Sequence, residues 1–112
     1  MKLEDLANND NSIKAIFNKG NSLCLEILSW NEKIINVEFR NCYGAKAKMA
    51  INAEIGDIKT NIQSPFSNEI IEEIMSGNGE ECEWSKLQDI AFCDVWSNRV
   101  ILEVIAESVF IS

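Results

Sequence analysis

Apolar side chains at every second position constrain the fold of this chain more than any other feature of its sequence. Residues 23–28 and 35–40 both follow this pattern, and the short polar turn 30–33 separates them. A period of two places alternate side chains on one face of a strand. Two such runs joined by a short turn predict a β-hairpin.

The same alternation predicts further strands. They lie at residues 13–17, at 47–53 after a turn at 41–44, at 87–93 and at 100–111. Residues 54–63 suit either a helix face or a strand, and we favour a strand after a turn at Gly56-Asp57. In the strand at 100–111, one face carries Leu102, Val104, Ala106 and Phe110. The other face carries Ile101, Glu103, Ile105, Glu107 and Val109. Because this second face is half apolar, we expect another element, such as a helix, to cover part of it.

Residues 67–76 carry the clearest helical pattern in the chain. Four apolar residues recur on one helix face: Ile70, Ile71, Ile74 and Met75. We expect Ser67 to cap the N-terminus through its hydroxyl. We expect Gly77 to end the helix in the left-handed conformation.

Together these patterns predict one α+β domain over residues 1–112. Its centre is an antiparallel sheet of five to seven strands, which strong curvature would turn into a half-barrel, with one main helix at about residues 67–76. A length of 112 residues, with 46% hydrophobic and 25% charged residues, is typical of a single globular domain.

Several kinds of chemistry are excluded by the residues that the chain lacks. It has no histidine, which rules out Ser-His and Cys-His nucleophiles. The four cysteines, Cys24, Cys42, Cys82 and Cys93, have spacings that fit no zinc finger or ribbon, and we expect free thiols. Neither a phosphate-binding loop nor a calcium loop is present. We therefore expect no cofactor, no metal and no enzymatic activity.

The start of the chain and its net charge bear on where the protein acts and what it binds. MKLEDLANNDNS has no apolar run and is not a secretory signal, so we expect a cytoplasmic protein with reduced thiols. A net charge of -8 repels nucleic acids and anionic membranes, and it attracts basic proteins.

Acidic residues gather in one part of the chain. Residues 60–85 contain six glutamates and no Lys or Arg. Acids can steer a basic partner, and tryptophan supplies contact area that becomes buried. The predicted partner-binding residues are Glu69, Glu72, Glu73, Glu80, Glu81, Glu83 and Trp84, with Asp94 and Trp96 on a second loop. The alternative for this region is a solvated acidic surface.

In overall character the chain resembles bacterial immunity proteins, which neutralise polymorphic or contact-dependent toxins. Those proteins are also short, acidic, often α+β and free of catalytic motifs. The segment DVWSNRVILEVIAES, residues 94–108, is similar to the closing segment of small bacterial proteins grouped with them. The resemblance implies a tight, non-enzymatic inhibitor of a toxin, often a basic nuclease, and it transfers no individual residue.

Two other functions remain open at this point. A homodimeric structural or regulatory subunit could form through an edge strand, and the half-apolar face of Ile101, Ile105 and Val109 motivates it. A small carboxylate-based hydrolase would need a pocket and an acid of raised pKa. Its candidate acids are Glu103 and Glu107 on one strand face, with Asp89 and Asp94 nearby.

Overall fold

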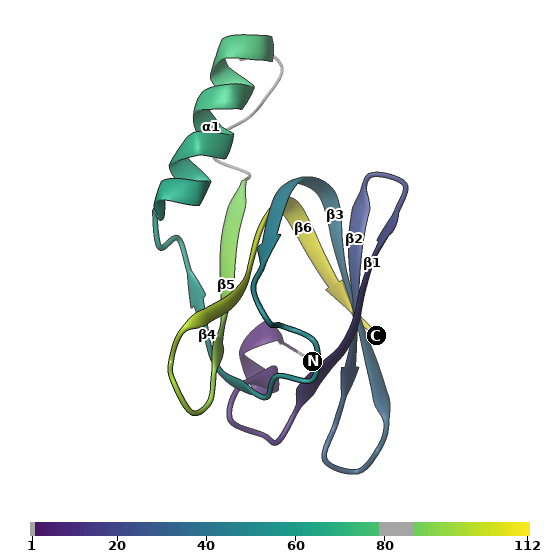
Figure 1. Cartoon of the computed structure of the whole chain (residues 1–112). Helices are drawn as coiled ribbons and strands as arrows, with labels where there is room; N and C mark the ends of the chain where they lie inside the picture. Colours follow the sequence, from purple (N-terminus) through teal and green to yellow (C-terminus); the bar gives the residue numbers. More distant parts are fainter. Residues whose placement is uncertain (1, 79–86) are drawn as a thin grey trace.

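The computed structural model describes residues 2–78 and 87–112. In chain order its elements are η1 (Leu3–Leu6), β1 (Ser12–Lys19), β2 (Ser22–Leu28), β3 (Ile34–Ala47), β4 (Ile55–Thr60), α1 (Pro65–Asn78), β5 (Gln88–Asp94) and β6 (Val100–Ile111). Within these residues, six strands form one antiparallel sheet in the order β1-β2-β3-β6-β5-β4 (Figure 1). The predicted α+β class and antiparallel sheet are confirmed.

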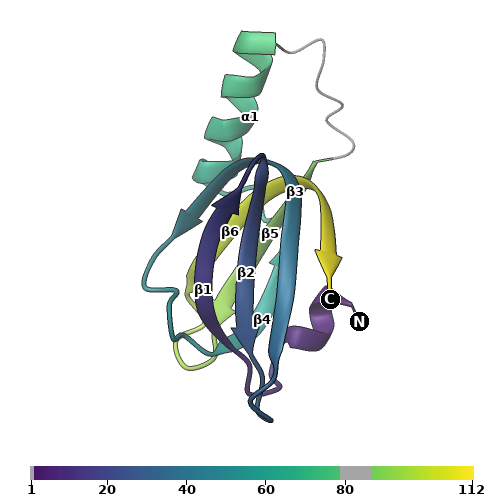
Figure 2. The same cartoon turned by 90° about the vertical axis from the view of Figure 1, so that its right-hand side faces the viewer.

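The sheet is strongly curved, and its two edge strands meet at one end (Figures 1 and 2). There, Ser12 forms an isolated antiparallel bridge with Glu54. The N–H of Ile13 donates to the carbonyl of Ala53 at 3.0 Å, and the N–H of Ile55 donates to the carbonyl of Asn11 at 2.8 Å. The sheet is not closed, because the pairing between its edges stops at this bridge within the described part of the chain.

The hydrophobic core fills the inside of the curve. Phe39 of β3 and Phe92 of β5 pack edge to face with ring centroids 6.2 Å apart, although β6 lies between their strands. Strands two positions apart in a flat sheet are separated by about 10 Å, so this contact reflects the curvature. At the end where the edges meet, η1 inserts the fully buried Leu6 into the core.

The chain around residue 41 differs from its prediction. The predicted turn at 41–44 is wrong, because β3 runs without a break from Ile34 to Ala47. Asn41 takes a positive φ of 52°, and the pairing with β6 shifts register between Cys42 and Gly44. A bulge of this kind bends a strand without ending it, and asparagine tolerates the left-handed conformation.

The predicted strand at 47–53 is also wrong. Residues 48–53 form turns, with Met49 at φ 54° and Asn52 at φ 68°. Two left-handed residues only three positions apart interrupt the extended conformation, and the pairing of β3 with β6 ends at Ala47. Met49 is 89% exposed, so the apolar alternation in this segment does not reflect a buried face.

The inward face of β6 changes partway along the strand. Leu102, Val104 and Ala106 are buried, as predicted, but beyond them Val109 and Ile111 pack against the core. Phe110, which was predicted to share the face of Leu102, is 46% exposed. The change falls opposite Asn41, since Arg40 pairs with Ser108 and Cys42 with Ala106.

The helix is longer than predicted at both ends. The N-cap is Ser64 rather than Ser67, because the Ser64 hydroxyl accepts the N–H of Ser67 at 3.0 Å and Pro65 is the first helical residue. Gly77 lies inside α1 and does not end it. Figure 2 shows α1 standing beyond one end of the sheet, with η1 at the other end. No helix in the described residues is long and apolar enough to cross a membrane.

Candidate functional site

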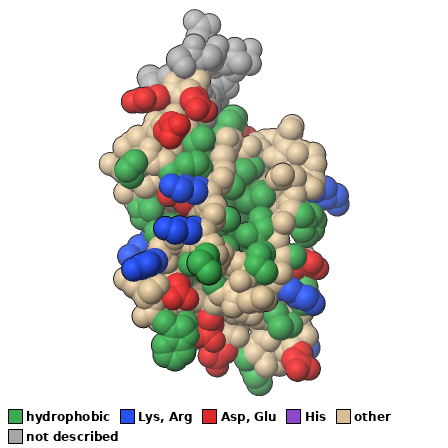
Figure 3. All heavy atoms as spheres, in the orientation of Figure 1, with side chains coloured by type: hydrophobic (Ala, Val, Ile, Leu, Met, Phe, Trp, Pro, Cys, Tyr) green, Lys and Arg blue, Asp and Glu red, His purple; other side chains and the backbone are tan. Residues whose placement is uncertain are grey.

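The exposed side of α1 is acidic. Glu69, Glu72 and Glu73 are all exposed, while Ile70 and Ile71 are half-buried. This is the amphipathic arrangement that the sequence predicts for the first turns of the helix. Figure 3 shows red acidic side chains together over α1, above the blue basic side chains of the sheet.

The first turns of α1 pack on the outer face of β3. A Cβ atom placed on Gly44 would lie 2.7 Å from Cδ1 of Ile70 and 3.3 Å from Cζ of Phe66. Only glycine allows this approach without movement of the helix side chains. The close contact sets the point from which α1 and its glutamates leave the sheet.

A second contact ties the cap of α1 to β6. The hydroxyl of Ser64 lies 2.8 Å from each carboxyl oxygen of Glu103 and donates to this group. The same hydroxyl accepts the N–H of Ser67. The N-cap side chain therefore joins the positive end of α1 to a buried carboxyl group of the sheet.

Glu103 belongs to a buried pair of carboxyl groups. It is 4% exposed, and Asp89 of the neighbouring β5 is 9% exposed. Ala91 pairs with Glu103 and Asp89 with Ile105, so the two acids are diagonal neighbours on one face. Among the described residues, no N–H or O–H group donates to either carboxyl oxygen of Asp89. Only a proton carried by one of the two carboxyl groups would supply a donor.

The surroundings favour the protonated form of Glu103. Burial is the largest cause, and the hydrogen bond and negative charge of Asp89 add to it, so that the pKa of Glu103 rises to about 7. The Ser64 hydroxyl and the charge of Lys46 act in the opposite direction. A neighbouring negative charge makes a carboxyl group harder to ionise. A proton held by Glu103 also supplies the donor that Asp89 lacks.

Glu103 also lines a small pocket beside the start of α1. The pocket has a volume of about 260 Å³. Its walls are formed by Lys46, Lys48, Ile62, Ser64, Pro65, Phe66, Val100 and Glu103.

Of the four acids predicted to act together, the structure joins Asp89 with Glu103. Glu107 instead accepts from the amide of Asn41 at 2.7 Å and from the hydroxyl of Tyr43 at 3.3 Å.

The other predicted contact loop lies at the opposite end of β5 from α1 (Figure 1). Asp94 shapes this loop: it accepts the N–H of Ser97 at 2.9 Å and the Ser97 hydroxyl at 2.8 Å. These bonds lower the pKa of Asp94. Trp96 is 88% exposed. The structure therefore does not join Asp94 and Trp96 to the glutamates of α1 in one surface.

The remaining predicted contact residues, Glu80, Glu81, Glu83 and Trp84, lie outside the described part of the chain.

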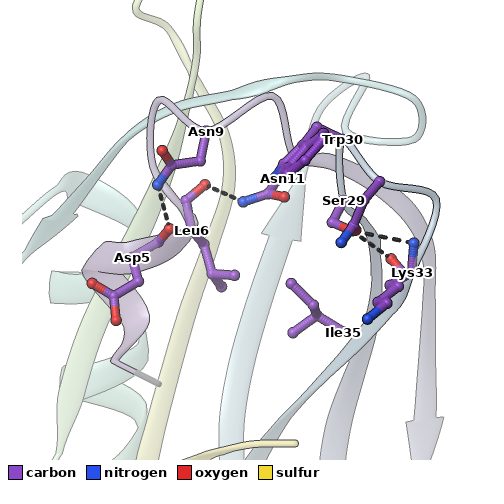
Figure 4. A pocket seen from close by; sticks show the side chains of 9 residues that line it. Asp5, Leu6, Asn9, Asn11, Ser29, Trp30, Lys33 and Ile35 are labelled. Atoms are coloured by element: carbon purple, nitrogen blue, oxygen red, sulfur yellow. Dashed lines mark hydrogen bonds between the residues drawn. The ribbon is translucent and has the colours of Figure 1, made fainter.

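The third tryptophan, Trp30, lies in the turn between β2 and β3. It lines a pocket of about 310 Å³ with Asn9, Asn11 and Ile35 (Figure 4). In that pocket the buried Asn11 amide donates to the carbonyl of Leu6 at 3.1 Å, which ties the loop before β1 to η1.

The apolar face that motivated a homodimer is not available for one. Ile101 and Ile105 are buried, and Val109 packs against the core. The start of α1 and the segment before it cover the outer face of β6 near Glu103, as predicted for a half-apolar face.

Among the described cysteines, Cys24, Cys42 and Cys93 are free thiols, and burial raises the pKa of Cys42 and Cys93. Cys82 lies outside the described residues.

Comparisons with known protein families, curated protein sequences and solved structures found no match for this chain.

Two residues of the candidate site escaped the sequence analysis. Ser64 stands directly before Pro65, and a serine followed by proline is a recognisable start of a helix. Ser67 precedes the apolar residues Ile70 and Ile71 more closely, and the sequence pattern therefore predicts the cap three residues too late. Gly44 has no comparable signal, because its role comes from a helix packed across the sheet.

Proposed function

We propose that this chain is a non-catalytic, cytoplasmic binding protein whose partner is a basic protein domain, as in bacterial immunity proteins that neutralise toxins. The observation that carries the proposal is the acidic face of α1 on a helix that projects beyond the sheet. Glu69 and Glu72 are exposed there, and no base occurs between Thr60 and Ser85. Surfaces without a binding role usually mix both signs of charge.

The attachment of α1 to the sheet supports this proposal. Ser64 and Gly44 fix the start of the helix, so the glutamates are presented from a rigid base. A fixed acidic surface lowers the ordering cost of binding and accelerates association with a basic partner. The proposed surface comprises Glu69, Glu72 and Glu73, with Glu80, Glu81, Glu83 and Trp84 following in the sequence. Asp94 and Trp96 would make a separate contact.

The first test is a pull-down from the native cells with the tagged full chain, at low and at high salt, read by mass spectrometry. We expect one basic protein in near-equal amount at low salt and much less of it at high salt. A matched bait, Glu69→Gln with Glu72→Gln, should recover several-fold less. If both baits recover the same proteins, or neither recovers a partner in stoichiometric amount, the acidic face of α1 is only solvated surface.

A carboxylate-based hydrolase is the second candidate function, and one observation favours it. Glu103 lines a pocket and has a pKa raised to about 7, which is suited to proton transfer near neutral pH. Against it, Ser64 and Asp89 already engage the Glu103 carboxyl group. Turnover of ester or glycoside model substrates that disappears in Glu103→Gln would establish this function in place of the first.

A further inference from the structure

The curved sheet has a second feature that the acidic helix does not explain, namely an opening between β1 and the second half of β3. A cavity of about 500 Å³ occupies this opening. Its walls include Ile16 and Asn18 of β1 and Ala45 and Ala47 of β3, and the buried Leu23 and Leu102 contribute to its lining. In the view of Figure 3, apolar side chains lie along the middle of this face.

Both long walls are strand edges. β1 pairs with β2 on one side only, and β3 pairs with β2 over residues 34–39 but with β6 alone over residues 44–47. Among the described residues, no backbone hydrogen bond of residues 14–19 leaves the β1–β2 pair. The opening is therefore bordered by backbone groups that lack a strand partner.

The register shows which groups of β1 face the opening. Gly20 and Asn21 form a two-residue turn, so the flanking pair Lys19–Ser22 is hydrogen-bonded. Hydrogen-bonded and non-hydrogen-bonded pairs alternate along an antiparallel ladder. Counting back from Lys19, Ile16 and Asn18 occupy non-hydrogen-bonded positions, so their N–H and C=O groups point away from β2. These are the two β1 strand residues that line the cavity before the turn.

The charge of the walls indicates what can lie between them. Residues 11–25 carry two lysines and no acid, and residues 39–53 carry three bases and no acid, in a chain of net charge -8. Lys14, Lys19, Lys46 and Lys48 are all exposed, and none of the described residues that line the cavity is charged. Figure 3 shows basic side chains to both sides of the apolar strip. Lysines on an edge also disfavour pairing between two copies of β1.

We infer that this opening binds an extended peptide segment of another protein, in which apolar residues alternate with Asp or Glu. The segment adds as a strand to the free edge of β1, where the N–H and C=O groups of Ile16 and Asn18 bond its backbone. Its apolar side chains pack on Leu23 and Leu102, and its acids lie near the lysines of both walls. This surface shares Gly44 with the contact that seats α1 but includes none of the helix glutamates, and it does not depend on the function proposed for that helix.

Three synthetic hexapeptides with blocked ends test the inference on the full chain. The first alternates glutamate with valine, the second alternates lysine with valine, and the third is the first with methylated backbone nitrogens at alternate residues. We expect the glutamate peptide to bind at least tenfold more tightly than either other peptide. It should also slow amide hydrogen exchange at Ile16 and Asn18, as followed by NMR.

Two matched variants locate the binding. Ala45→Glu adds one negative charge to the wall and should weaken the glutamate peptide at least tenfold, whereas Thr60→Glu adds the same charge on β4 and should change binding less than twofold. The double variant Lys14→Gln with Lys19→Gln removes two positive charges from the β1 wall without placing a larger side chain in the cavity. It should also weaken binding of the glutamate peptide. Equal binding of all three peptides, or unchanged exchange at Ile16 and Asn18, would overturn the inference. Exchange that slows with protein concentration alone would assign the edge to a second copy instead.

Discussion

The hydroxyl of Ser64 lies 2.8 Å from both carboxyl oxygens of Glu103, and it accepts the N–H of Ser67 at 3.0 Å. One side chain therefore caps α1 and also holds the helix to the sheet. Because the pKa of Glu103 is raised to about 7, the protonation of this carboxyl group bears on how firmly α1 is attached.

The first prediction concerns the pH dependence of stability. The pKa of Glu103 in the folded state, about 7, lies above its ordinary value of 4.5, so the folded state binds the proton more tightly. This contribution is fully present below pH 4.5 and is lost as the pH rises through 7. We expect the free energy of unfolding to lose about 2–3 kcal/mol from this group between those limits. Urea denaturation at intervals across that range measures it.

Glu103→Gln removes this titration while it keeps the shape of the side chain. Its amide can donate to Asp89, and its oxygen can accept from Ser64. We expect a flatter stability profile between pH 5 and 8, whereas Glu69→Gln on the exposed face of α1 should leave the slope unchanged. An equal slope in the wild type and in Glu103→Gln would show that Glu103 does not hold the proton.

The second prediction separates the two causes of the raised pKa. Asp89→Asn removes the neighbouring negative charge but leaves Glu103 buried. We expect the pKa of Glu103 to fall and yet to stay above 4.5, because burial is the larger cause. Titration of the Glu103 side-chain carbon by NMR gives the value directly. A pKa that does not move would mean that Asp89 and Glu103 do not interact.

The third prediction tests the seat of α1 on β3. Gly44→Ala would place a methyl group 2.7 Å from Cδ1 of Ile70, so the Ile70 side chain must move. We expect a loss of about 1–2 kcal/mol in stability. Ile70→Ala removes the obstacle, so the double variant should lose less than the sum of the two single ones.

Gly20→Ala is the matched control for that cycle. Gly20 has a φ of 61° and nothing within 4 Å of the added methyl group, so its cost comes from the backbone alone. It should add independently to Ile70→Ala in thermal or urea denaturation. Strict additivity for Gly44→Ala as well would mean that α1 does not rest on Gly44.

The strands with regular alternation could be predicted from the sequence, and the bent region could not. β2 and β6 lie close to their predicted bounds because one face of each is buried along most of its length. Asn41 misled the prediction, since a polar residue that favours turns lies here at a bend within a continuous strand. The exposed alternation of Met49 and Ile51 misled it further. Both errors arise because local pattern does not show whether a segment finds a partner strand.

Of the candidate site, the sequence predicted only the acidic charge of the α1 surface. The exposed glutamates of α1 were found because exposure follows from helical spacing. The contacts that place the helix were not found, since Ser64, Glu103 and Gly44 are distant in sequence and meet only through the pairing of β3 with β6 and the packing of α1 across these strands. Asp94 and Trp96 lie at the far end of β5 because the strand runs from the side of α1 to the loop that these two residues belong to.

That separation leads to the last prediction, which concerns binding to a basic partner. Glu69→Lys with Glu72→Lys reverses charge on α1, so association should slow about tenfold or more and become less dependent on salt. Trp96→Ala changes a loop at the other end of β5 and should leave the association rate within about twofold. Stopped-flow or surface-based kinetics at two salt concentrations distinguish the two surfaces. If Trp96→Ala slows association and the charge reversal does not, the partner approaches the β5–β6 loop rather than α1.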